Sequence, residues 1–278
     1  MTILSQKEVL AARVQQFLEG SESRVIPTIL DLSGDWEVGR DELIIPALGT
    51  LELRALPVDG NDAVDVTQSV VGDTLEIKTA REVHNYVYWT DQRHSMIDRI
   101  SAFFDTAPRI FAQGLEKAVI DQLEVSATND FDAAVAAGEF NIGNIAEAAK
   151  RLDVMRVPRG ERFLLCSPDG MSQLASFKEF QEAHRFGGTN DALMNGIVGM
   201  IKGFNVVMSP DITDDVLHCY HRNSVAFALA GGSIEDVVQP IPQQSRTYMA
   251  LKGLYGAKLL TNATKGPMKV TIDYTSGP

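Results

Sequence analysis

The residues with the most obvious capacity for chemistry stand together in His218-Cys219-Tyr220-His221. Imidazole nitrogens and a thiolate are zinc ligands, so three of these four positions could bind a metal ion. On a β-strand, however, His218 and Cys219 point to opposite faces, and no fourth ligand lies nearby in the sequence. The pattern favours a half-buried strand. The other histidines, His84, His94 and His184, are scattered and are interpreted as surface or core polar residues.

A second motif, Gly170-Met171-Ser172-Gln173-Leu174, nearly forms the turn that exposes a nucleophilic serine in hydrolases. Its last position is Leu instead of Gly. The preceding Ser167-Pro168-Asp169 fits a helix start better, because Ser caps a helix and Pro is preferred at its first position. We therefore expect Ser172 to lie on a helix.

Carboxylates gather at two places that could hold a divalent ion. They are Asp130 and Asp132, and further on Asp211, Asp214 and Asp215. Neither group has the spacing of a calcium loop, with its central Gly and terminal Glu, so both are predicted to be solvated loops. The sequence also contains no Walker-type loop, dinucleotide fingerprint or zinc-protease helix. The prediction is therefore no catalytic, cofactor-binding or metal-binding residue.

Composition narrows the class of protein. The chain has 278 residues, of which 45% are hydrophobic, so it can bury a sizeable core. Its net charge of -12 argues against tight, phosphate-led binding of nucleic acid, which depends on clustered Lys and Arg. Cys166 and Cys219 are too few for a disulfide framework and are expected to fill the core. No segment has the pattern of a membrane span or a signal peptide.

The N-terminal part predicts a short amphipathic helix over Ser5 to Glu19, followed by an extended arm from Arg24 to Gly49. From Thr50 to Trp89 the hydrophobic period changes to two, which predicts a long hairpin with turns at Asp59-Gly60 and Gly72-Asp73. Charged residues on its alternate face suggest that the hairpin is exposed and gains stability from another chain.

Residues Asp91 to Val125 carry the longest helical pattern in the chain. Pro108 lies within it and cannot donate a hydrogen bond to the carbonyl of Phe104, so a kink or a break into two helices is expected there. Asn141 should cap a helix that runs through Leu152. Further elements are a buried strand at Phe163–Cys166, a helix from Ser167 to about Phe180, and strands at Val216–Tyr220, Thr247–Leu251, Ala257–Leu260 and Met268–Tyr274. The fold class is α+β.

Three glycines punctuate the stretch from Gly196 to Pro210, which reads Gly-Ile-Val-Gly-Met-Ile-Lys-Gly-Phe-Asn-Val-Val-Met-Ser-Pro. Glycine permits positive φ or close backbone approach, while Phe204, Val206 and Met208 alternate as the buried face of a strand. This run resembles a segment of tailed-phage major capsid (coat) proteins of the Hong Kong 97 fold. Arg162 to Pro168 and Leu254-Tyr255-Gly256-Ala257-Lys258 also resemble that family.

The order of elements resembles the family over nearly the whole chain. The resemblance implies an N-terminal helix and arm (1–49), an extended loop formed by a β-hairpin (50–90), a spine helix of the peripheral domain (91–130), an axial domain (131–239) and returning strands of the peripheral domain (240–278). The N-terminal arm and the hairpin would reach across neighbouring subunits.

The function implied by the resemblance is structural: hexamers and pentamers of one chain close an icosahedral phage head around double-stranded DNA, with no sequence-specific binding and no membrane. The protein would be located in the virion after assembly in the host cytoplasm, with separate scaffolding and portal proteins as partners. Some shells of this family are crosslinked through lysine, for which Lys78 is the nearest candidate, but no matching Asn is evident and no crosslink is predicted. Two alternatives remain, an encapsulin-like compartment of the same fold and an α+β enzyme with an unrecognised site.

Overall fold

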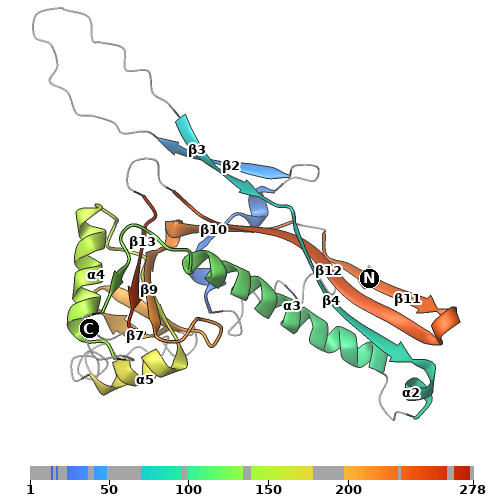
Figure 1. Cartoon of the computed structure of the whole chain (residues 1–278). Coiled ribbons are helices and arrows are strands. Elements are labelled where there is room, and N and C mark those ends of the chain that lie inside the picture. The colour runs from blue at the N-terminus through green and yellow to red at the C-terminus, as the bar shows by residue number, and fades with distance from the viewer. Residues whose placement is uncertain are drawn as a thin grey trace, which may run out of the picture.

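The computed structural model describes residues 14, 17, 24–36, 41–48, 70–94, 99–133, 139–177, 197–230, 233–261 and 266–275. These residues form three sheets and two groups of helices. An elongated sheet with a long helix on one face extends from a mixed α/β body, and a narrow ribbon projects from their junction (Figure 1).

The elongated sheet has the strand order β1-β10-β12-β11, and β4 also pairs with β12. Its strands are β1 (Leu30–Asp31), β10 (Val225–Leu229), β11 (Glu235–Ile241), β12 (Arg246–Leu259) and β4 (Thr79–Tyr88). Helix α3 (Arg99–Leu123) packs on one face, where Phe111, Leu115 and Val119 are buried with Leu251 and Tyr255. The apolar stripe of the helix therefore packs on the sheet in the largest core that the described residues form.

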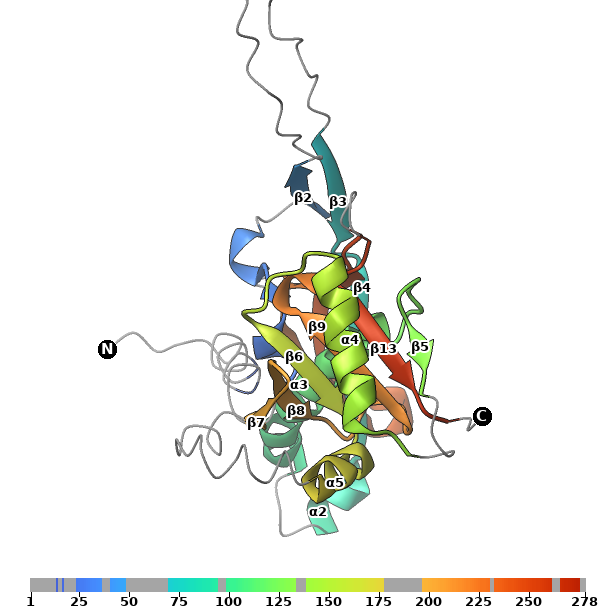
Figure 2. The same cartoon turned by 90° about the vertical axis from the view of Figure 1, so that its left-hand side faces the viewer.

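The body contains a second sheet with the order β5-β13-β9-β6-β8-β7. The strands are β5 (Phe131–Asp132), β13 (Lys269–Asp273), β9 (Val216–His221), β6 (Arg162–Cys166), β8 (Phe204–Met208) and β7 (Ile197–Ile201). Helices α4 (Ile142–Val154) and α5 (Pro168–Ser176) contribute to a core with one face of this sheet, and Figure 2 shows α4 crossing in front of β6, β9 and β13. All residues of β6 are buried, as expected for a central strand covered on both sides.

The third sheet is a two-stranded ribbon of β2 (Glu42–Leu48) and β3 (Val70–Glu76). The shorter elements are helix α2 (Trp89–His94) and the 3-10 turns η1 (Ile26–Thr28), η2 (Ser33–Asp35), η3 (Arg222–Ser224) and η4 (Pro242–Gln244). No helix among the described residues is both long and apolar enough to cross a lipid bilayer.

The N-terminal expectations need correction. Of the helix expected over residues 5–19, only Val14 and Phe17 are described, and both are helical. The extended arm predicted from Arg24 to Gly49 is wrong in its first part, because Ile26 and Ile29 are buried in the core and Leu30 pairs with Ala226 of β10. Apolar side chains in this segment pack on their own subunit instead of on a neighbour.

The long hairpin is also placed differently from the expectation over Thr50–Trp89. Its first strand begins at Glu42, and Gly72-Asp73 is not a turn, because both residues lie inside β3 opposite Pro46 and Ile45. After Glu76, the last residue of β3, the chain leaves the ribbon and continues as β4. This strand pairs with β12 over ten residues from Thr79 to Tyr88. The turn expected at Asp59-Gly60 lies outside the described residues.

Helix α3 runs without a break through Pro108. Of the two alternatives expected at that residue, a kink or a break, the break is therefore wrong. Pro108 and the neighbouring Ala107 are buried, and packing against the sheet offsets the missing backbone hydrogen bond. The described helical residues of this part of the chain are α2, which ends at His94, and α3, which begins at Arg99; residues 95–98 lie outside the described ranges.

Local signals in the body are confirmed more closely. Asn141 caps α4 through a capping box with Asn144, and the Ser167 hydroxyl caps α5 by accepting from the Gly170 amide at 3.1 Å. Helix α5 ends at Ser176, earlier than the expected Phe180. Lys202 and Gly203, with φ of 49° and 87°, form the two-residue turn between β7 and β8.

The late strands differ from expectation in their grouping. The segments Thr247–Leu251 and Ala257–Leu260 belong to the single strand β12. Residues 240–278 do not stay together, because β12 lies in the elongated sheet whereas β13 pairs with β9 and β5 in the body. Residues 225–239 likewise join the elongated sheet through β10 and β11.

Candidate assembly surfaces

The base of the ribbon is fixed to the elongated sheet by apolar packing and by polar contacts. Leu75 and Ile77 are buried against the small residues Ala226 and Ala228 of β10. The Lys258 ammonium donates to the Thr74 carbonyl at 2.8 Å, and the Thr261 hydroxyl donates to Asp73 at 2.9 Å. The base of the ribbon is thus held against the elongated sheet.

Close backbone approach at this base depends on Gly256 of β12. A Cβ atom at that position would collide with the backbone carbonyl oxygen of Glu76 and lie 3.3 Å from the Ile77 side chain. Backbone at such a distance leaves no room for any side chain, so glycine is required here.

Farther out on the ribbon, Ile44 is 70% exposed. The projecting strands form a sheet of their own, and no other described strand extends this sheet by backbone hydrogen bonds. A two-stranded ribbon is marginally stable alone, so an exposed one with an apolar side chain is suited to lie on another chain.

The second surface is the face of the elongated sheet that points away from α3. Along β4, Val83 and Val87 face the helix, so Glu82, His84 and Tyr86 alternate to the other side. Cross-strand partners Tyr248 and Lys252 of β12 complete this exposed aromatic face.

Side chains on this aromatic face hold one another in place. Arg246 stacks over the Tyr86 ring at 4.1 Å, and the Tyr86 and Tyr248 rings lie 5.4 Å apart. The Tyr248 hydroxyl donates to Glu82 at 3.1 Å, and the Lys252 ammonium lies 3.3 Å from the same carboxylate. The Tyr248 hydrogen bond and Lys252 lower the pKa of Glu82, so the carboxylate is charged at neutral pH. Exposed, ordered aromatic and Arg side chains are typical of protein interfaces.

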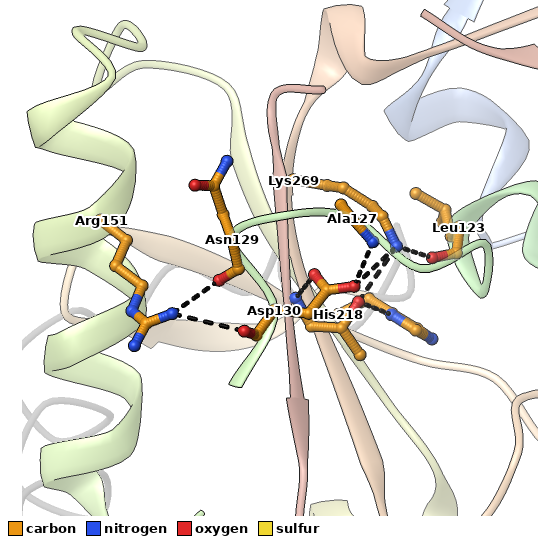
Figure 3. A network of polar contacts seen from close by, with 8 residues as sticks. Leu123, Ala127, Asn129, Asp130, Arg151, His218 and Lys269 are labelled. Carbon is orange, nitrogen blue, oxygen red and sulfur yellow. Dashed lines mark hydrogen bonds and ion pairs between the residues drawn. The ribbon is translucent and has the colours of Figure 1, made fainter. Parts of the chain in front are cut away.

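A buried polar network connects α3 to the sheet of the body (Figure 3). The Lys269 side chain is fully buried, and its ammonium donates to the Leu123 carbonyl at 2.6 Å and to the Thr271 hydroxyl at 3.1 Å. Asp130 lies 3.7 Å from this ammonium and accepts from the amides of Ala127 and Thr271. Burial lowers the pKa of Lys269, whereas Asp130 opposes that shift.

The network extends to α4 as well. Arg151 donates to the backbone carbonyls of Asn129 and Asp130 and stacks over the Phe131 ring at 4.3 Å. The segment after α3 is therefore held between two helices, and Asp130 is a structural residue instead of the solvated loop residue that was expected.

The predicted strand at His218–His221 is present, but these residues are buried on both faces and the strand is not half-buried as expected. His218 and Cys219 face opposite sides, as predicted. Cys219 packs in the core beneath α4, whereas His218 Nδ1 lies 3.1 Å from the Thr271 hydroxyl on the α3 side. His221 accepts a hydrogen bond from the Asn223 amide at 3.1 Å. Among the described residues no group of three or more His, Cys, Asp or Glu side chains could hold a metal ion.

The remaining candidate residues are placed as follows. Ser172 lies within α5 and is exposed, not at a strand-to-helix turn. Cys166 is buried and its pKa is raised to about 12 by burial, so its thiol is an unreactive core group. Lys78 lies beside Glu42 at 3.4 Å and Glu76 at 3.6 Å, which raise its pKa. The carboxylates Asp211, Asp214 and Asp215 lie in the loop before β9. Asp215, the last residue of that loop, adopts a positive φ of 62°.

Comparison with solved structures defines the class of fold. The chain is similar to a structure of Mycobacterium phage Che8, with 16% identity, a TM-score of 0.64 and coverage of 93% of this chain and 90% of that one. It is also similar to the capsid of Ralstonia phage GP4, with 14% identity, a TM-score of 0.66 and coverage of 90% and 88%. The predicted α+β capsid fold of tailed phages is therefore confirmed.

A third similar structure is the virus-like particle from Pyrococcus furiosus, with 10% identity, a TM-score of 0.59 and coverage of 96% of this chain and 98% of that one. No family profile matches the sequence, and no curated protein is similar to it. The likeness is thus one of backbone architecture over nearly the full length of each chain.

Proposed function

We propose that this protein is the major capsid protein of a tailed phage, which self-assembles into hexamers and pentamers of an icosahedral shell around double-stranded DNA. The observation that carries the proposal is the shared fold over about nine-tenths of both chains in the comparison with the phage GP4 capsid. A partial match would have been compatible with one shared domain inside an unrelated protein.

The surfaces of the chain support a structural role. The projecting ribbon and the exposed aromatic face offer each copy contacts that its own fold leaves unused. Repeated contacts of modest strength add up in a closed shell, because several neighbours hold each subunit at once. We assign the ribbon as the segment that reaches across a neighbour, and the elongated sheet with α3 as the rigid wedge.

The net charge of -12 suits a container for DNA. An acidic inner wall repels the phosphate backbone and keeps the packed polymer mobile. Scaffolding and portal proteins are the partners that such a shell would require, and the virion is the corresponding location.

The second candidate is a compartment of the same fold that encloses a protein cargo, favoured by the likeness to the Pyrococcus furiosus virus-like particle. The contents of purified particles distinguish the two candidates. Nuclease-protected DNA inside them supports the phage head, whereas one uniform co-purifying protein supports the compartment.

The test of the proposal is negative-stain electron microscopy of the expressed full chain, with nuclease treatment before imaging. Closed, uniform shells are the expected result, formed alone or after addition of a scaffolding protein. A chain that stays monomeric or dimeric at high concentration and with a scaffold would overturn the proposal and revive the enzyme alternative.

A further inference from the structure

An acidic pocket of about 530 Å³ lies between the end of α3 and the sheet of the body. Its lining contains no Lys or Arg. Four carboxylates line it: Glu124, Asp130, Asp132 and Asp273. Lys269 compensates Asp130, but within the described part of the chain Asp132 has no ion-pair partner and its side chain is exposed. Glu124 and Asp273 accept hydrogen bonds from Thr213 and Thr275. Asp132 is thus the carboxylate of this lining whose charge the described fold leaves without a partner.

His218 in the same lining indicates that the pocket is incomplete. Its side chain is 1% exposed, and its Nε2 atom has no hydrogen-bond partner in the described structure. An ammonium group has no acceptor, so in its contact with Thr271 the Lys269 ammonium is the donor. The Thr271 hydroxyl is then free to donate its own hydrogen to His218 Nδ1. The hydrogen of the neutral His218 ring is therefore on Nε2. A buried donor without an acceptor is costly. Lys and Arg side chains only donate, so the acceptor should be a backbone carbonyl of a docked segment or a water that this segment holds.

The complementary feature is a basic cluster in an otherwise acidic protein. Lys150, Arg159, Arg162 and Lys202 line a second hollow of about 460 Å³ together with one carboxylate, Asp153. The Arg159 and Lys150 side chains are 83% and 70% exposed and form ion pairs with Asp153 and Glu147. Arg162 is buried and also pairs with Asp153. Lys202 stands at the tip of the β7–β8 turn and has no ion-pair partner among the described residues.

These two features lie on opposite sides of one sheet. His218 and Thr271 face α3, whereas the alternate residues Leu217, Cys219 and Val270 pack beneath α4, which carries Lys150. Figure 1 shows α3 and α4 on the two sides of this sheet. The two features also lie at opposite ends of the sheet. Val216 of the pocket is the first residue of β9, which lies beside the end of β6, whereas Arg162 of the basic cluster is the first residue of β6.

We propose that the basic cluster of one copy, led by Lys202 on its turn, docks into the acidic pocket of a second copy. Two different patches on opposite sides of a subunit make a head-to-tail contact, which closes into a ring when the rotation allows. The contact deepens the proposed function and rests on it, since it names the residues that join neighbouring subunits around a ring. Because the acidic pocket and the basic cluster belong to the same chain, charge complementarity favours a second copy as the partner.

Cysteine crosslinking tests the contact directly. A chain with both Asp132→Cys and Lys202→Cys should form, on oxidation, a ladder of covalent multimers that ends at the ring size. Each single variant should stay monomeric, because a head-to-tail contact places position 132 against position 202. Native Cys166 and Cys219 are buried and do not compete. Dimers from a single variant would show a symmetric contact and overturn the proposal.

Charge exchange provides the second test. Asp132→Lys and Lys202→Glu alone should each raise the protein concentration for half-assembly about tenfold or more, because each places like charges together. The chain that carries both changes should recover most of the loss. Asp35→Lys, at an exposed site near β1, is the matched control and should assemble normally. Failure of the double variant to recover would refute the ionic contact.

The two proposals fail in different ways. Particles without a crosslinked ladder would refute the head-to-tail contact and leave the capsid function standing. A ladder that ends at a small ring, without any closed particle, would keep the contact and refute the shell. Circular dichroism and thermal unfolding of every variant show whether a loss arises from misfolding instead.

Discussion

Lys269 is a charged residue in a fully buried position, and its partners explain how the fold tolerates it. The ammonium satisfies the Leu123 carbonyl at the end of α3 and balances the Asp130 carboxylate. A buried ion pair is weak evidence for stability, but removal of one partner leaves the other uncompensated.

Lys269→Met should therefore lower the free energy of unfolding by about 3 kcal/mol, measured by urea denaturation of the unassembled subunit. Lys78→Met is the control, because Lys78 is exposed and forms only surface ion pairs, so its loss should cost far less than that of Lys269. Equal effects of the two variants would contradict a structural role for the buried network.

His218 gives the subunit a pH dependence of defined sign. Burial, and to a lesser degree Lys269, lowers its pKa from 6.5 to about 3 in the folded chain. Between these values the unfolded chain binds a proton that the folded chain does not, so stability falls as pH falls below about 6.5.

At pH 5 the cost from this residue should be roughly 2 kcal/mol relative to pH 7, since one pKa unit corresponds to about 1.4 kcal/mol. His218→Gln should remove most of that difference in urea unfolding measured at the two pH values. An unchanged pH dependence in the variant would show that another group is responsible.

At the scale of elements, the ribbon depends on β12 passing close beneath it. Gly256→Ala should destabilise the subunit by about 2–3 kcal/mol, because the added methyl group meets the Glu76 backbone, which cannot move aside as a side chain could. Thermal unfolding measures the loss. Gly34→Ala is the matched control with open space around it, and a similar loss there would contradict the steric explanation.

The strand pairing also explains why the hairpin was misplaced by sequence reasoning. Alternation is equally visible in β3 and β4, and nothing local shows that β3 pairs with β2 whereas β4 pairs with the distant β12. Pro108 is a similar case. A proline inside a helix usually breaks it, but here packing of the helix against the elongated sheet outweighs that local preference.

At the scale of the whole molecule, the ribbon should be needed for assembly but not for folding. Replacing residues 46–72 by Asn-Gly joins Ile45 to Asp73, which are direct cross-strand partners, through a favourable two-residue turn. Leu43 and Leu75 remain in the core. The shortened chain should unfold within a few degrees of the unassembled parent and form no shells.

Electron microscopy and thermal unfolding of the same preparation measure the two effects separately. Normal shells from the shortened chain would refute the role assigned to the ribbon. A large loss of stability would show instead that the ribbon belongs to the folding unit.

Local sequence determined much of this protein: the helix caps at Asn141 and Ser167, the Lys202-Gly203 turn and the buried strand at Phe163–Cys166 depend on neighbours a few residues away, and the order of such elements was enough to indicate the capsid fold. Only the tertiary structure decided which strands pair, that Asp130 meets Lys269, and that acidic and basic patches lie on opposite sides of one sheet. Those contacts join residues far apart in the chain, so hydrophobic period and turn chemistry carry no information about them.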